Sequence, residues 1–281
     1  MKDKWIKLRE KTICEGMLIH SITSPIAIND CANVVLALGA KPIMAEHPDE
    51  VAEITAIAKA LTVSYANITD ARRRSIMIAG KKALDNNIPC IVDAVGVTCS
   101  SMRMQDVKTF IKECRPTIVK GNVSEIKALA GLDFKNTGID VSLSDKIESK
   151  DKSKIYDFAD TIKEYAKNID SIVVATGEVD VISDGDICFI GYNGSPDMAK
   201  VTGTGCILTC IMGVYMACVD KADKRAQLTA AALALTTMGI AGEMADSTKG
   251  LGTYHMSFID KLSLLTSREI VEQARFDLIC R

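Results

Sequence analysis

Short β-branched runs alternate along the chain with longer stretches whose apolar residues recur at helical spacing. This alternation predicts a largely parallel sheet whose strands are joined by crossover helices. The predicted strands cover residues 88–92 (IPCIV), 117–119 (TIV) and 171–175 (SIVVA). The predicted helices cover residues 31–38, 50–61, 73–86, 104–113, 124–130, 154–168, 206–219 and 225–245. The expected fold class is therefore α/β.

Each predicted strand passes from apolar residues into a polar residue at its carboxyl end. Asp93 follows the first strand, Lys120 follows the second and Thr176 follows the third. Open α/β sheets bind their ligands outside the carboxyl ends of the strands. We therefore expect the functional site at this edge of the sheet.

The two predicted helices 206–219 and 225–245 are apolar almost all round. Such helices are typical of a protein interior, and we expect them to be buried, in part against another subunit. The one dense charge run, residues 144–154, reads SDKIESKDKSK and predicts a solvated loop. Because neither a flexible linker nor a repeat interrupts the chain, we expect one domain over residues 1–281.

Composition narrows the class of protein. Of the 281 residues, 48% are hydrophobic and 25% are charged, which is typical of a folded globular chain. The net charge of −2 provides no field that would attract nucleic acid or an anionic membrane, so we expect small molecules or other subunits as partners. The 10 cysteines include no C-x-x-C pair, and the chain starts without the apolar core of a signal peptide. A reduced, cytoplasmic protein is the prediction.

The clearest local motif is VTGTGC, residues 201–206, followed at once by an apolar helix. Gly203 and Gly205 permit a tight turn, and with Thr204 they place backbone N–H groups near the start of the helix, where an anion such as phosphate can bind. Cys206 would lie in the positive end of the helix dipole, which lowers a thiol pKa, so it can act as a base or a nucleophile. The alternative is a glycine turn that only begins a buried helix.

A second motif, KGNVSE, follows the predicted strand 117–119. Lys120 can reach a phosphate, while Asn122 and Glu125 carry oxygen ligands suited to Mg²⁺, with Asp93 as a further acidic candidate. A purely structural interpretation is also open, because Asn122 or Ser124 can cap the helix that begins here. The chain contains neither a P-loop nor the complete glycine pattern of a dinucleotide-binding fold.

Four blocks together resemble hydroxyethylthiazole kinase, a thiamine-salvage family of the ribokinase-like superfamily. They are HSITSPIAINDCANVVLALGAKPIMAEHPDEV, KGNVSEIKALAG, ATGEVDVISDG and VTGTGC, which occur in the family's order between residues 20 and 210. The resemblance implies a three-layer α/β/α sandwich around a mostly parallel sheet. It also implies ATP and Mg²⁺ as co-substrates, phosphorylation of the alcohol of 4-methyl-5-(2-hydroxyethyl)thiazole, and a homotrimer with active sites between subunits.

The resemblance also assigns roles to residues. The thiazole contacts of the family fall on Met44 and Gly203, and its ATP contacts fall on Lys120, where many relatives carry arginine, and on Thr176. Cys206 occupies the position of the catalytic base, which is commonly aspartate in the wider superfamily. His20, which lies in the first block beside an apolar run, is expected to have a structural role.

Two departures concern the acceptor pocket. The family's I-T-N pattern reads Ile22-Thr23-Ser24 here. After Asp93 the chain reads AVGVTCSS, where relatives usually continue with proline and a Gly-Ala pair. Two alternatives therefore stay open. One is another ribokinase-like kinase, for instance for the pyrimidine half of thiamine, and the other is a non-catalytic sensor of nucleotide or thiazole.

Overall fold

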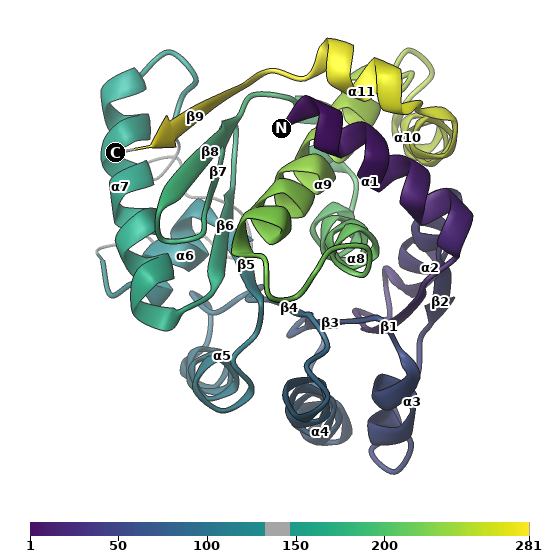
Figure 1. The fold of residues 1–281 in the computed structure, drawn as a ribbon, viewed down its shortest axis with the longest axis vertical. Helices are drawn as coiled ribbons and strands as arrows, with labels where there is room; N and C mark the ends of the chain where they lie inside the picture. Colours follow the sequence, from purple (N-terminus) through teal and green to yellow (C-terminus); the bar gives the residue numbers. More distant parts are fainter. Residues whose placement is uncertain (133–146, 281) are drawn as a thin grey trace.

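A nine-stranded sheet runs through the molecule in the order β2-β1-β3-β4-β5-β6-β7-β8-β9 (Figure 1). The computed structural model describes residues 1–132 and 147–280. Strands β1 to β6 are parallel to one another, and β7, β8 and β9 add an antiparallel extension that begins at β6. The strands are β1 Leu18–Ile22, β2 Lys41–Ile43, β3 Ala60–Ser64, β4 Cys90–Asp93, β5 Ile118–Asn122, β6 Ile172–Thr176, β7 Asp180–Ser183, β8 Ile187–Gly191 and β9 Phe276–Cys280.

Helices cover both faces of this sheet, which confirms the expected three-layer α/β/α arrangement (Figure 1). The helices of one face are α1 Lys2–Glu15, α2 Ile28–Ala37, α8 Thr204–Met216, α9 Lys224–Met244, α10 Leu251–Leu264 and α11 Ser267–Gln273. Those of the other face are α3 Val51–Ile57, α4 Asp70–Asp85, α5 Ser101–Cys114, α6 Val123–Leu129 and α7 Lys152–Ile169. A short 3-10 helix, Pro196–Lys200, precedes the glycine turn. No helix of the described residues is both long and apolar enough to cross a membrane.

The three predicted strands exist, and each continues into the polar residues expected to follow it. Asp93 ends β4, Asn122 ends β5 and Thr176 ends β6. The predicted helix 50–61 is wrong in its second half, because α3 ends at Ile57 and β3 begins at Ala60. Pairing with β1 and β4 buries all of β3, so sheet formation overrides a spacing that fits a helix equally well.

The predicted loop 144–154 is wrong at its end. Asp151 caps helix α7 by accepting a hydrogen bond from the backbone N–H of Lys154, so residues from Lys152 onward are helical. Residues 144–146 lie outside the described part of the chain.

Helices α8 and α9 are buried, as their composition predicts. Every residue of α8 from Cys206 to Met216 is buried within this one chain, and so is most of α9. Their apolar surfaces are therefore covered by the chain's own sheet and helices. Contact with another subunit is not needed to bury them, and that part of the expectation is wrong.

The α4–α5 contact yields a test of the packing. A Cβ added at Gly80 would lie 2.4 Å from Phe110 Cε2 and 2.8 Å from Cys114 Sγ. Gly80→Ala should lower the free energy of unfolding by about 1–3 kcal/mol, because overpacking outweighs the helix propensity of alanine. Gly252→Ala in α10 is the matched control, because a Cβ there meets nothing within 4 Å. Urea unfolding measures both, and a Gly80→Ala variant as stable as wild type would contradict this packing.

Candidate active site

The polar residues that end neighbouring strands lie side by side at one edge of the sheet. The register pairs Ser64 with Asp93, Asp93 with Lys120, and Asn122 with Thr176. The Thr176 hydroxyl donates a hydrogen bond to the Gly121 carbonyl across β5 and β6, at 3.4 Å. The structure thus brings together Asp93, Lys120, Asn122 and Thr176, as expected from the sequence.

A buried ion pair forms the centre of this edge. Lys120 Nζ lies 2.9 Å from Asp93 Oδ1, and the two side chains are 4% and 3% exposed. Burial opposes the positive charge of Lys120, but the Asp93 carboxylate outweighs it and raises the lysine pKa. Lys120 is therefore a permanent cation at the floor of the site.

The glycine turn lies directly above this cation. Gly203 precedes α8 with φ 87°, a left-handed conformation that favours glycine, and it provides no side-chain cap for the helix. A Cβ at Gly203 would lie 2.9 Å from the Ala27 Cβ, and one at Gly205 would lie 3.4 Å from Lys120 Nζ. Without a side-chain cap, the first N–H groups of α8 remain available to an anion beside Lys120.

Cys206 occupies the first turn of α8, and the residue is 8% exposed. Its Sγ lies 3.8 Å from the Ser64 hydroxyl oxygen. Burial raises the pKa of this thiol, and the charge of Asp93 raises it further, while Lys120 and the hydroxyls of Thr23 and Ser64 act in the opposite direction. The predicted lowering of the thiol pKa is therefore wrong, because burial and the charge of Asp93 together raise that pKa.

Asn122 and Glu125 form a capping box at the start of α6. The Asn122 side chain accepts from the Glu125 N–H at 2.9 Å, and the Glu125 carboxylate accepts from the Asn122 N–H at 2.7 Å. The structural interpretation of this motif is thus confirmed, with Asn122 rather than Ser124 as the cap. Glu125 also accepts from the Gly96 N–H at 2.7 Å, which fixes the loop after β4.

The same carboxylate is compatible with a divalent cation. Burial, and then the charge of Asp93, raise the pKa of Glu125 to about 7. Two buried carboxyl groups thus share one neighbourhood with the single ammonium of Lys120, and an additional cation would relieve their repulsion. In the described residues, no group of three or more histidine, cysteine or acidic side chains forms a metal cage. The donors fit a cation held jointly with ligand oxygens.

The segment after β1 closes the other side of the glycine turn. Ala27 contacts Gly203, and the Ser24 hydroxyl donates to Asn67 Oδ1 at 2.7 Å. Met44 follows the edge strand β2 and is half-buried against the core cluster that contains α2 and α8. His20 has the expected structural role, because its ring nitrogens bond to Thr55 Oγ1 and to the Ala45 carbonyl oxygen, both at 2.9 Å.

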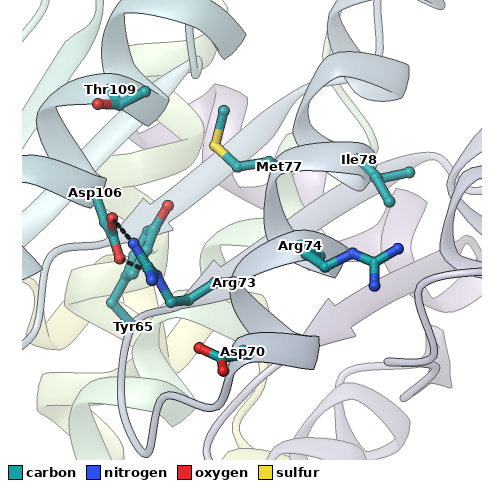
Figure 2. A pocket seen from close by; sticks show the side chains of 8 residues that line it. All are labelled: Tyr65, Asp70, Arg73, Arg74, Met77, Ile78, Asp106 and Thr109. Carbon is teal, nitrogen blue, oxygen red and sulfur yellow. Dashed lines mark hydrogen bonds and ion pairs between the residues drawn. The ribbon is translucent and has the colours of Figure 1, made fainter.

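A groove of about 480 Å³ lies apart from this edge, between α4 and α5. Figure 2 shows the guanidinium of Arg73 facing the carboxylate of Asp106, and two of its nitrogens lie 2.7 Å from the Asp106 oxygens. Tyr65 and Met77 also line the groove. None of the residues predicted from the sequence lines it, so the candidate active site is the edge described above.

Sequence reasoning missed Ser64, whose hydroxyl contacts the Cys206 thiol. Ser64 ends β3, the strand that the helical spacing of residues 50–61 concealed. A correct assignment of β3 would have placed Ser64 at the carboxyl edge and made it a candidate.

The three-layer sandwich described above is a ribokinase-like fold, as the comparison with solved structures shows. A ribokinase-like superfamily protein from Enterococcus faecalis V583 shares this fold, with a TM-score of 0.61 at 12% identity over 95% of each chain. The solved hydroxyethylthiazole kinase protein from Pyrococcus horikoshii OT3 matches with a TM-score of 0.85 at 28% identity, covering 99% of this chain and 100% of that one.

The hydroxyethylthiazole kinase family model matches residues 11–268. Hydroxyethylthiazole kinase 2 of Clostridium botulinum strain Okra is 42% identical over 272 residues, which cover 97% of this chain and 99% of the relative. Hydroxyethylthiazole kinase of strain Eklund 17B is 38% identical over 282 residues. The chain belongs to the hydroxyethylthiazole kinase family.

Proposed function

We propose that this chain transfers the γ-phosphoryl group of ATP to the hydroxyl of 4-methyl-5-(2-hydroxyethyl)thiazole, a step of thiamine salvage. The observation that carries the proposal is the uncapped N-terminus of α8, which lies directly over the buried Lys120 ammonium and carries Cys206 in its first turn. Membership of the family supports the choice of substrate.

Phosphoryl transfer requires mainly alignment and compensation of negative charge. The N–H groups from Gly203 to Cys206 would receive the transferred phosphoryl oxygens, because no side chain competes for them. Lys120 would neutralise charge on the phosphates, and Thr176, two strand ends beyond Asp93, would bind the nucleotide.

Asp93, Asn122 and Glu125 would hold Mg²⁺ together with phosphate oxygens. When bound there, Mg²⁺ would supply neutralisation of the negative charge on the phosphates. The carboxylates of Asp93 and Glu125 are positioned for this before any ligand binds, one by Lys120 and the other by the N–H groups of Gly96 and Asn122. Both carboxylates are thereby kept at the edge where the nucleotide is expected.

We assign acceptance of the alcohol proton to Cys206. Its Sγ is buried beside Ser64 Oγ, at the helix start that receives the phosphoryl group. Because burial keeps the resting thiol protonated, the reactive form is the minor thiolate fraction. Met44 and Gly203 would contact the thiazole ring.

We further propose a cytoplasmic homotrimer with active sites between subunits. The 10 cysteines are all free thiols, as in reducing compartments. Several apolar side chains are exposed on α2, on α10 and in the loop before α2, namely Ile26, Leu36, Met256 and Leu264, at 63%, 57%, 71% and 70%. Helices α2 and α10 pack together, and Ile26 adjoins Ala27, which contacts Gly203. A partner covering these residues would border the site.

A substrate panel tests the function. The purified protein is incubated with ATP, Mg²⁺ and thiazole, pyrimidine or sugar alcohols, and phosphorylated products are detected by mass. We expect product from hydroxyethylthiazole only. Product from the pyrimidine alcohol instead would assign another ribokinase-like kinase, and nucleotide binding without any product would indicate a sensor.

Two substitutions test the role of Cys206. Cys206→Ala should lower kcat by about 10²- to 10⁴-fold, as general-base loss does, and leave the Kd for ATP nearly unchanged. Cys206→Asp should retain or increase kcat, because a carboxylate beside Lys120 ionises more readily than a buried thiol. Cys210→Ala is the matched control, since Cys210 is also buried and lies one turn further along α8. A Cys206→Ala variant within about threefold of wild-type kcat would remove Cys206 from the mechanism.

A further inference from the structure

Arg72 differs from the two arginines that follow it in α4. Arg73 forms its ion pair with Asp106 at the groove in Figure 2, and Arg74 is exposed. Arg72 is buried, with 3% of its surface exposed, and its guanidinium points to the carboxyl edge of the sheet. Removing a charged guanidinium from water costs free energy unless the protein supplies hydrogen-bond partners, so the partners of Arg72 indicate its role.

Those partners come from three separate loops. Arg72 Nη1 donates to the carbonyls of Ala66 and Asn67 at 3.0 and 3.1 Å, and Nη2 donates to the carbonyl of Thr23. Its Nε is buried without a hydrogen-bond partner and lies 3.5 Å from a carboxylate oxygen of Glu46. One side chain therefore connects the segments that follow β1, β2 and β3.

The connected segments form the wall of the site around Cys206. Residues 64–67 carry the Ser64 hydroxyl that contacts the Cys206 thiol. Thr23 precedes Ser24, whose hydroxyl bonds to the side chain of Asn67. The same loop continues to Ala27 against the glycine turn. Glu46 lies two residues after Met44.

Within the described residues, no hydrogen bond or ion pair of the Arg72 side chain reaches the nucleotide side of the site. Asp93, Lys120 and Thr176 lie on β4, β5 and β6. The side chains of Asp93 and Lys120 pair with each other, and the Thr176 hydroxyl bonds to the backbone of β5. Loss of Arg72 should therefore loosen the wall on the acceptor side and leave the phosphate side in place. The planar guanidinium is needed for this geometry, since its donors lie on separate nitrogens in a fixed fork, whereas those of an ammonium all lie on one nitrogen.

We propose that Arg72 is a positioning residue that sets the shape of the acceptor-alcohol pocket, acting through Thr23, Asn67 and Glu46. The proposal rests on the kinase function proposed above. It explains how the Ser24 hydroxyl, which lies in a loop without regular structure, is held in a fixed position near Ser64 at the end of β3. Displacement of the acceptor by about 1 Å costs on the order of 100-fold in rate, so a small change in this wall is consequential.

The test compares Arg72→Met and Arg72→Lys with Arg73→Met, the matched control that removes an ion pair from the next residue of the same helix. For Arg72→Met we expect the KM for hydroxyethylthiazole to rise about 10- to 100-fold and the KM for ATP to stay within about twofold. Arg72→Lys should fold and show an intermediate acceptor KM, because it keeps the charge but not the fork. Arg73→Met should leave both constants unchanged. A further variant, Arg72→Ala, leaves room for a free guanidinium ion in place of the side chain. Millimolar guanidinium should partly restore the acceptor KM of this variant.

Melting curves of all variants separate positioning from stability. An acceptor KM unchanged in both Arg72→Met and Arg72→Lys would overturn the proposal. Equal increases in the KM of ATP and of the acceptor would also overturn it, as would a loss of rate that only follows the folded fraction. If wild type itself turns over no thiazole alcohol, the proposed function fails. Calorimetry then tests Arg72 separately: equal affinity of wild type and Arg72→Lys for the thiazole alcohol would refute a role of Arg72 in the pocket.

Discussion

The buried ion pair between Lys120 and Asp93 is the constraint around which this structure is organised. Two charges that are almost inaccessible to water are stable only if they stay together, and each would be costly alone. The parallel register of β4 and β5 places their side chains opposite each other. The helix that begins at Thr204 then brings its uncapped N–H groups to the cationic member of the pair.

The neighbouring groups respond to this pair. Burial, and then the carboxylate of Asp93, raise the pKa values of both the Glu125 carboxyl and the Cys206 thiol, so both groups hold protons more tightly than they would in water. A nucleotide with its cation would alter this balance, since a cation favours ionised carboxyl groups. The site is therefore assembled before ligands arrive, while its final protonation depends on them. This preorganisation is what phosphoryl transfer requires of a protein.

Much of this arrangement could be predicted from the sequence, where short-range pattern and structure agree. The passage from apolar to polar residues located the ends of β4, β5 and β6, and the VTGTGC motif located the helix start. The prediction of a helix over residues 50–61 was wrong in its second half because the spacing there fits a helix and a buried strand equally well. Only pairing with β1 and β4 decides between them. The prediction of a lowered pKa for the Cys206 thiol was wrong for a related reason. A sequence shows that a cysteine begins a helix, but not how deeply that cysteine is buried.

Arg72 shows most clearly what cannot be predicted from the sequence. Three consecutive arginines on an amphipathic helix look alike in the sequence, and nothing marks the first as the one that turns inward. Its proposed role follows from bonds to carbonyl groups on two loops, one just before α4 and one 49 positions away at Thr23. The hydrogen bond between Ser24 and Asn67 also cannot be predicted from the sequence, since it joins residues 43 positions apart.

The dependence of kcat on pH in wild type and in Cys206→Asp tests the central claim, that the thiol over the Lys120–Asp93 pair takes the proton of the alcohol. Because burial raises the thiol pKa above its ordinary value of 9.0, the thiolate fraction increases with pH throughout the neutral range. Wild-type kcat should therefore rise about tenfold per pH unit between about pH 7 and 9, whereas Cys206→Asp should already be level there. A wild-type kcat that is flat over the same range, or that has the same profile as the aspartate variant, would contradict the account.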